Sequence, residues 1–137
     1  MTIAEFTDTN ILSYAHADGE DARIAGAKRL MDRLWEQGGG MLSTQVLAEF
    51  YRACVRKQRL SPSAAREMVR VYTPWQAHSA TPENVRAAID LSIEHTLSFW
   101  DALIVVSALA MGARILWSED LQHGRRFGGL EVRNPFI

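Results

Sequence analysis

Short apolar runs alternate with longer amphipathic segments along the whole chain. From Ala102 to Ala110 the side chains are apolar or small on every side, which predicts a helix that is buried all round. Ser98 stands three residues before Asp101, and this pair is an acidic variant of the capping box that starts helices. The run Arg114–Trp117 then predicts a short buried strand. A buried helix that leads into a buried strand indicates a parallel sheet covered on both faces.

The rest of the chain repeats this alternation. Further short runs predict strands at Ile3–Asp8, at Met41–Leu42, within Tyr72–His78 after Pro74, and at Leu130–Arg133. Further helices are predicted over Ile11–Ala17 and from starts at Asp18–Asp21, Ser43 or Thr44, Ser61–Pro62 and Thr81–Glu83. On the last of these we expect one face to point inward, formed by Val85, Ala88, Ile89 and Ser92. The alternation predicts an α/β fold in one domain over residues 1–137: a three-layer α/β/α sandwich with a short parallel sheet.

Four acidic residues fall where such a fold gathers functional groups. In open parallel sheets, ligands bind outside the carboxyl ends of the strands. Asp8 ends the first strand and Asp120 follows the last buried strand, while Glu49 and Asp101 lie on helices that start near this edge. Carboxylates that pack together raise one another's pKa, so an ionised cluster needs a cation. Ligands that are all oxygen atoms suit Mg²⁺ or Mn²⁺ rather than zinc.

Each of these acids also has an ordinary structural role open to it. Asp8 could cap a helix, and Glu49 could pair with Arg52 across one helical turn. Asp101 could serve only the capping box, and Asp120 could cap the turn that follows it. Their joint position at one edge of the predicted sheet favours a shared site.

At these acids the sequence resembles the PIN-domain ribonucleases, and within them the VapC-type toxins of bacterial toxin–antitoxin pairs. The matching pieces come in the order of the family and extend over the whole chain. They are FTDTNIL at 6–12, LSTQVLAEFY at 42–51, FWDAL at 99–103 and ILWSEDL at 115–121. A single Asp-Thr-Asn would be a weak signal, whereas four correctly spaced pieces on one α/β pattern are a specific one.

The resemblance implies a metal-dependent endoribonuclease that is the toxin of such a pair. Water activated by Mg²⁺ or Mn²⁺ would attack an RNA phosphodiester. The resemblance also implies that Asn10 and Ser118 are polar supports, and that a cognate antitoxin protein binds the chain. It implies that the catalytic metal is held by the four acids, Asp8, Glu49, Asp101 and Asp120. Glu119 is an extra acid in the last motif, and we expect it to face solvent.

Charge and cysteine content narrow the chemistry. The chain of 137 residues has a formal net charge of −1, so any RNA contact must use a local basic patch. We expect that patch to include Arg52 and Arg56 beyond the second acidic motif, and Arg125 and Arg126 after the last one. Cys54 is the single cysteine, which excludes an internal disulfide and a cysteine-based zinc site.

Location and assembly can also be predicted. The N-terminal residues lack the features of a secretory signal, and the longest apolar run is too short to span a membrane, so we expect a cytoplasmic protein. The helices that start at Ser61 and Pro82 have apolar faces, with Tyr72 and Trp75 between them. A chain this small cannot bury all of that surface in one core, and we therefore expect a homodimer, as the resemblance also implies.

Two other functions and two side chains are left open. A phosphoacceptor signalling domain also gathers acids around Mg²⁺, but it needs an acid after the third strand and a late lysine. The sequence has no acid at 75–80 and no lysine after Lys57. A non-catalytic interaction module would not need four acids.

Trp100 beside Asp101 is either a packing residue or a platform for a base, and His123 either contacts substrate or orders its loop.

Overall fold

Within residues 2–137, which the computed structural model describes, six short strands form one sheet in the order β3-β2-β1-β4-β6-β5. The strands are β1 Glu5–Thr7, β2 Gly40–Ser43, β3 Gln76–His78, β4 Ile115–Trp117, β5 Arg126–Phe127 and β6 Leu130–Arg133. Strand β1 pairs in parallel with β2 and β4, β2 with β3, and β4 with β6. Strand β5 returns antiparallel to β6 as a hairpin, and the sequence pattern did not predict it.

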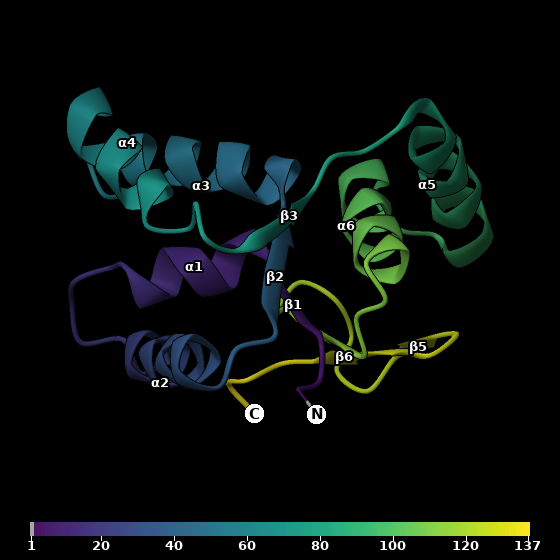
Figure 1. Ribbon diagram of the computed structural model, residues 1–137, viewed down its shortest axis with the longest axis horizontal. Helices are drawn as coiled ribbons and strands as arrows, with labels where there is room; N and C mark the ends of the chain where they lie inside the picture. Colours follow the sequence, from purple (N-terminus) through teal and green to yellow (C-terminus); the bar gives the residue numbers. More distant parts are fainter. Residues whose placement is uncertain (1) are drawn as a thin grey trace.

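Helices cover both faces of this sheet. They are α1 Thr9–Ala15, α2 Ala22–Gln37, α3 Thr44–Arg56, α4 Pro62–Arg70, α5 Pro82–His95 and α6 Phe99–Ala110. Figure 1 shows α1 to α4 on one side of the strands, with α5 and α6 packed against each other on the other side. The predicted α/β fold, a mostly parallel sheet between layers of helices, is confirmed.

The order of the strands creates a reversal at the centre of the sheet. From β1 the chain moves through β2 to β3 at one edge, and it then returns to place β4 on the other side of β1. The carboxyl ends of β1 and β4 therefore lie at the topological switch point, where crossovers leave the sheet in opposite directions. In folds of this type that point is where ligands bind.

Side-chain caps fix where three of the predicted helices begin. The Oγ of Ser43 accepts a hydrogen bond from the backbone of Val46, and Ser61 caps α4 in the same way. Ser98 Oγ accepts from the backbone N–H of Asp101, 3.1 Å away. Each such bond satisfies a helix-end donor and is worth about 1 kcal/mol. The last cap holds α6 in register and so fixes the position of Asp101.

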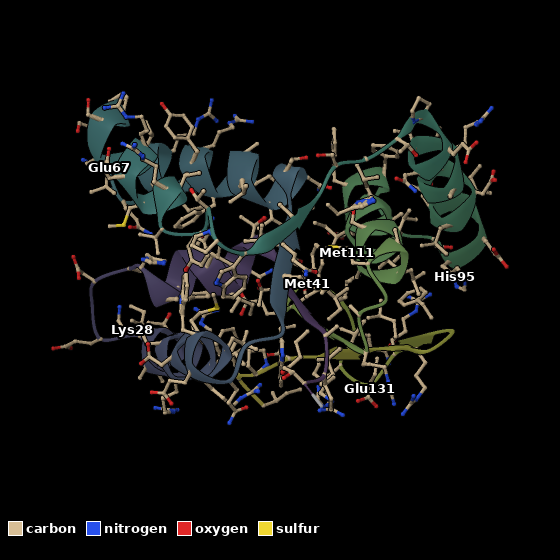
Figure 2. The ribbon with its side chains drawn as sticks, in the orientation of Figure 1. Lys28, Met41, Glu67, His95, Met111 and Glu131 are labelled. Carbon is tan, nitrogen blue, oxygen red and sulfur yellow. The ribbon has the colours of Figure 1, made fainter. Side chains whose placement is uncertain are left out.

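Helix α6 is buried because it lies between two hydrophobic clusters. Its residues 102–108 are all buried, as predicted, but the prediction is wrong for Leu109 and Ala110, which are exposed at the end of the helix. Ile104 and Val105 belong to the main core, which also contains Met41 at the centre of the view in Figure 2. Ala102 and Leu103 belong to a second cluster beneath α5. An all-apolar helix is expected where both sides are covered by protein.

The inward face predicted for α5 is wrong in part. Ala88 is fully buried and Ser92 is half-buried, but Val85 and Ile89 are 37% and 44% exposed. The small side chain of Ala88 lets α5 approach α6 closely, so the contact is a narrow seam. Ile93, one turn after Ile89, is 75% exposed. An apolar stripe therefore remains on the outer surface of α5.

Tyr72 is also placed differently from the prediction. Expected at an intersubunit surface, it is 2% exposed and packs edge-on against Phe50 in the core. Its hydroxyl is hydrogen-bonded to the ring of His16. Trp75 is half-buried, and its ring lies over Gly40, where an added Cβ would be only 2.5 Å away. Glycine at the start of β2 thus lets the Trp75 ring lie directly against the strand.

The described helices differ from a membrane span in length or composition when each is taken singly. No single one is both long and apolar enough to cross a bilayer. Helices α5 and α6 meet the criteria of length and composition only together, and they bend by 118° at the break between them.

Candidate active site

The four acids predicted from the sequence line one cavity of about 890 Å³. They reach it from four different elements. Asp8 follows β1, Glu49 lies in the middle of α3, Asp101 lies in the first turn of α6, and Asp120 follows β4. The cavity opens at the carboxyl ends of β1 and β4, which is the switch point of the sheet. Residues far apart in the sequence are thus brought together by the topology.

Asp8 is the most buried of the four acids, with 4% of its surface exposed. It is the N-cap of α1, and its Oδ1 accepts a hydrogen bond of 2.7 Å from the backbone N–H of Thr9. Burial raises the pKa of Asp8 to about 7, and the nearby charges of Asp120 and Glu49 add to the increase. Hydrogen bonds from Ser118 and Thr9 oppose it. Asp8 therefore caps α1 and also has a carboxyl group whose ionised form is disfavoured by its surroundings.

Asn10 and Ser118 connect Asp8 to the loop that follows β4. Asn10 Nδ2 donates to Asp8 Oδ2 at 3.4 Å and to Asp120 Oδ2 at 3.0 Å, and its Oδ1 accepts from the backbone of Glu119. Ser118 is fully buried, and its Oγ donates to Asp8 Oδ2 at 2.8 Å. The same Oγ accepts from the backbone N–H of Asp120. These bonds fix both carboxylates relative to β1 and β4.

Thr9 is a further residue of the site that sequence reasoning missed. Its Oγ1 donates a hydrogen bond of 2.7 Å to Glu49 Oε1 and so joins the start of α1 to the middle of α3. Its position between Asp8 and Asn10 was the available signal. Across the cavity, burial raises the pKa of Asp101, and the charge of Asp120 raises it further. Asp8 and Asp101 therefore each have an acidic neighbour in the cluster that raises their pKa.

The donor set fits a divalent cation with oxygen ligands. Four carboxylates share the cavity, and burial together with the charges of neighbouring carboxylates raises the pKa of Asp8 and Asp101. A bound cation would favour the ionised forms of these two side chains. Within residues 2–137, no three His, Cys, Asp or Glu side chains are already arranged as a metal-binding group. Instead Thr9, Asn10 and Ser118 donate to the carboxylates. The oxygen ligands suit a divalent cation. Binding the ion would require some of the carboxylates to exchange these hydrogen bonds for contacts with the metal.

The four arginine residues predicted to contact RNA lie in two different places. In the described part of the chain, the cavity lining includes Arg52 and Arg56 but neither Arg125 nor Arg126. Arg126 pairs with Glu131 at 3.1 Å. Figure 2 shows Glu131 on the β5–β6 side of the molecule, well away from α3. The structure thus brings the first pair to the acids and leaves the second pair at the hairpin.

Glu119 was expected to face solvent, and this prediction is wrong. Its Oε1 accepts a hydrogen bond of 3.0 Å from the hydroxyl of Tyr14, and its Oε2 pairs with Arg23 at 3.4 Å. The guanidinium of Arg23 lies over the Tyr14 ring, 4.7 Å from its centroid, and also pairs with Asp21. This cluster ties the loop after β4 to α1 and α2 at the rim of the cavity.

The two side chains left open by the sequence are now placed. His123 Nδ1 accepts a hydrogen bond of 2.9 Å from the backbone of Asn134, so it orders the loop before β5. Trp100 lines the cavity beside Asp101 and is 60% exposed. It is therefore not a core residue.

Comparisons with known proteins concern the family and the fold. Residues 6–126 match the model of the PIN domain family. The fold is similar to VapC20 of Mycobacterium tuberculosis, described as a sarcin-ricin loop cleaving toxin, with 24% identity, a TM-score of 0.67 and coverage of 82% of this chain and 87% of that one.

Two further solved structures are similar over almost their whole length. A toxin–antitoxin complex from Klebsiella pneumoniae has 16% identity and a TM-score of 0.72, and VapBC2 from Rickettsia felis, bound to a DNA fragment from its promoter, has 17% and 0.70. Each comparison covers 96% of this chain and 98% of the other. Among curated proteins the search finds no match. At these identities the structural likeness shows a shared fold.

Proposed function

Because the chain belongs to the PIN domain family, we propose that it is a divalent-metal-dependent endoribonuclease and the toxin of a toxin–antitoxin pair. The observation that carries this proposal is the meeting of Asp8, Glu49, Asp101 and Asp120 in one cavity that also holds cationic side chains. Strand β3 ends at His78 without an acid, and no observation favours the phosphoacceptor alternative.

The proposed mechanism assigns a task to each group of residues. A cation held by the four acids would lower the pKa of an attacking water and neutralise charge on the phosphate. Asn10 and Ser118 orient the carboxylates of Asp8 and Asp120, because their hydrogen bonds hold those oxygens in place. Thr9 does the same for Glu49. The hydrogen bonds that are kept when the ion binds would set the geometry of the acids before the substrate arrives, which lowers the cost of reaching the transition state.

Cations on α3 would hold the RNA backbone. Arg52, Arg56 and Lys57 line the same cavity as the acids. Arg52 lies about one turn and Arg56 about two turns beyond Glu49 along α3. In the described residues Glu49 and Arg52 form no ion pair, so Arg52 is not neutralised by the acid next to it. Phosphate contacts of this kind supply most of the non-specific affinity for nucleic acid.

The partner, the assembly and the location are part of the proposal. Similar structures are toxin–antitoxin complexes, and a basic side chain of an antitoxin could pair with the acids in place of the metal. A second copy of the chain could cover the apolar stripe of α5 formed by Val85, Ile89 and Ile93. Such pairing would give the homodimer expected from the sequence. The protein would act on RNA in the cytoplasm.

The test is cleavage of total RNA by the purified protein with Mg²⁺ or Mn²⁺ and with EDTA. We expect cleavage only with metal, and its loss in Asp101→Asn. Asp32→Asn is the matched control, because Asp32 is an exposed acid on α2 outside the cavity. Equal cleavage in EDTA, or equal cleavage by Asp101→Asn, would contradict the proposal.

A further inference from the structure

Trp100 is an exposed aromatic residue that lines the cavity next to acidic and amide side chains. Its exposed fraction is 60%, whereas Trp side chains are usually largely buried. The acid Asp101 follows it directly in the first turn of α6, and Gln45 and Glu49 on α3 line the same cavity. A partner made of apolar side chains would meet carboxylates here. A nucleobase suits this position better, because it offers an aromatic face and polar edges.

The backbone and ring of Trp100 are held from two sides. Gln45 Nε2 donates a hydrogen bond of 3.2 Å to the backbone carbonyl of Trp100, which joins α3 to the start of α6. The ring of Phe99 meets the indole edge-on, with 5.0 Å between centroids and 72° between planes. Phe99 itself packs against the cluster beneath α5. An indole supported in this way is exposed without being free, which is what a stacking surface requires.

The cavity has a fixed order of groups along α3. Gln45, Glu49, Arg52 and Arg56 follow one another at helical spacing and all line the cavity. Gln45, which donates to the backbone of Trp100, lies about 6 Å before Glu49 along the helix axis, while Arg56 lies about 10 Å beyond it. Along α3 the cavity therefore presents first an aromatic ring, then the acids and then the arginine side chains. An RNA strand that places a phosphate at the acids would place a base on one side and further phosphates on the other.

We propose that Trp100 is the stacking platform for the base next to the cleaved phosphate, and that Gln45 positions it. The inference rests on the proposed ribonuclease function and adds a substrate class, RNA in which that base is unpaired. A base inside a duplex cannot present its face to the indole, so recognition requires a single-stranded segment. Stacking on an aromatic side chain is tolerant of sequence, since every base has a π-face.

Fluorescence of the single-stranded probes pentacytidylate and pentaadenylate bound to the protein tests the contact without cleavage. The Asp8→Asn background with Mg²⁺ keeps the probe intact. Either probe is expected to quench the tryptophan emission of Asp8→Asn, and also that of Asp8→Asn combined with Trp35→Phe. The quenching should be lost in Trp100→Phe. Trp35 is the matched control because it is 41% exposed on α2 and does not line the cavity. Equal quenching in both variants would overturn the proposal.

Kinetics with a modified substrate test the role in recognition. Trp100→Ala should raise KM about five- to a hundredfold, with kcat within twofold, whereas Trp100→Phe should stay near the wild type. An abasic nucleotide beside the cleaved bond should raise KM of the wild type by the same factor and have no further effect in Trp100→Ala. Additive effects would overturn the proposal.

The outcomes separate this inference from the function on which it rests. If the wild type cleaves RNA and Trp100→Ala cleaves it equally well, the proposed stacking platform is refuted and the proposed nuclease function is not. A wild-type protein that never cleaves RNA would refute the nuclease, and the quenching experiment would still decide whether Trp100 receives a base. Loss of dimer or antitoxin binding in Trp100→Ala, with unchanged KM and quenching, would assign the indole to a protein interface instead.

Discussion

Asn10 and Asp120 are joined by a hydrogen bond of 3.0 Å although 110 residues separate them in the sequence. The amide that reaches Asp120 also reaches Asp8, so one short side chain spans the gap between β1 and the loop after β4. This bond connects the first and last acidic motifs of the chain.

Replacing Asn10 should therefore impair the site more than the fold. Asn10→Ala removes contacts with Asp8, Asp120 and the backbone of Glu119, and we expect kcat for RNA cleavage to fall at least tenfold. The loss of stability should be about 1 kcal/mol. Asn84→Ala is the control, because it removes a capping hydrogen bond from α5 and Asn84 does not line the cavity. Equal kcat in both variants would show that Asn10 does not orient the acids.

The raised pKa of Asp8 predicts how the metal-free protein responds to pH. Burial places the pKa of Asp8 at about 7, above the unfolded value of about 3.9. Between these values the folded state binds more protons, so the free energy of unfolding in EDTA should fall as pH rises from about 4 to about 7. The loss due to Asp8 should be about 4 kcal/mol at most.

Urea denaturation at several pH values, compared with Asp8→Asn, measures this effect. The neutral amide has no titration, so the variant should gain stability relative to the wild type as pH rises. Saturating Mg²⁺ should restore the wild type, because a bound cation favours the ionised carboxyl. Parallel pH profiles for the two proteins would count against the assignment of strain to Asp8.

Glu5 forms a buried ion pair that we expect to matter for stability. Its carboxylate is 5% exposed and receives two bonds from the Arg33 guanidinium, at 2.8 and 3.0 Å, and one from the Trp117 indole at 2.8 Å. Burial raises the pKa of Glu5, but the hydrogen bonds from Arg33 and Trp117 outweigh it and hold the pKa below its usual value. Arg33→Met should lower the free energy of unfolding by about 3 kcal/mol, since it leaves a buried charge unpaired.

Two controls isolate this effect in chemical denaturation. Combining Arg33→Met with Glu5→Leu removes both charges and should recover much of the loss. Arg70→Met breaks an exposed pair with Glu67 and should change stability little. A double variant as unstable as Arg33→Met alone would point to lost packing instead of the unpaired charge.

Gly40 provides a test of the close packing at the start of β2. Gly40→Ala would place a Cβ 2.5 Å from the Trp75 ring, which must then move. We expect a loss of about 1–3 kcal/mol in thermal or urea unfolding. Gly129→Ala is the matched control, since a Cβ there meets no atom within 4 Å. If both variants are equally stable, the indole is more mobile than its position against the strand indicates.

The acids could be predicted from the sequence because their positions depend on local pattern. Short apolar runs locate the ends of strands, and a parallel sheet brings those ends to one edge, so Asp8 and Asp120 follow from pattern alone. The bond between Thr9 and Glu49 could not be predicted, since it depends on how α1 crosses α3. For the same reason the rim contact of Glu119 with Tyr14 was missed.

Periodicity also says which residues share a face without saying what covers that face. The pattern of α5 placed Val85 and Ile89 with Ala88, but the small side chain of Ala88 set the depth of the contact and left the larger ones outside. The hairpin strand β5 was missed because two residues carry no detectable period. These differences arise from tertiary packing, which local sequence does not encode.

The central position of β4 beside β1 has a consequence for the order of synthesis on the ribosome. A nascent chain that ends before Ile115 already carries three of the four acids, but the strand that must lie against β1 and the serine that holds Asp8 have not been made. The site can therefore assemble only after β4 and Ser118 have emerged. A chain truncated before β4 would lack both the strand that pairs with β1 and the serine that donates to Asp8, so the four acids would not be brought together.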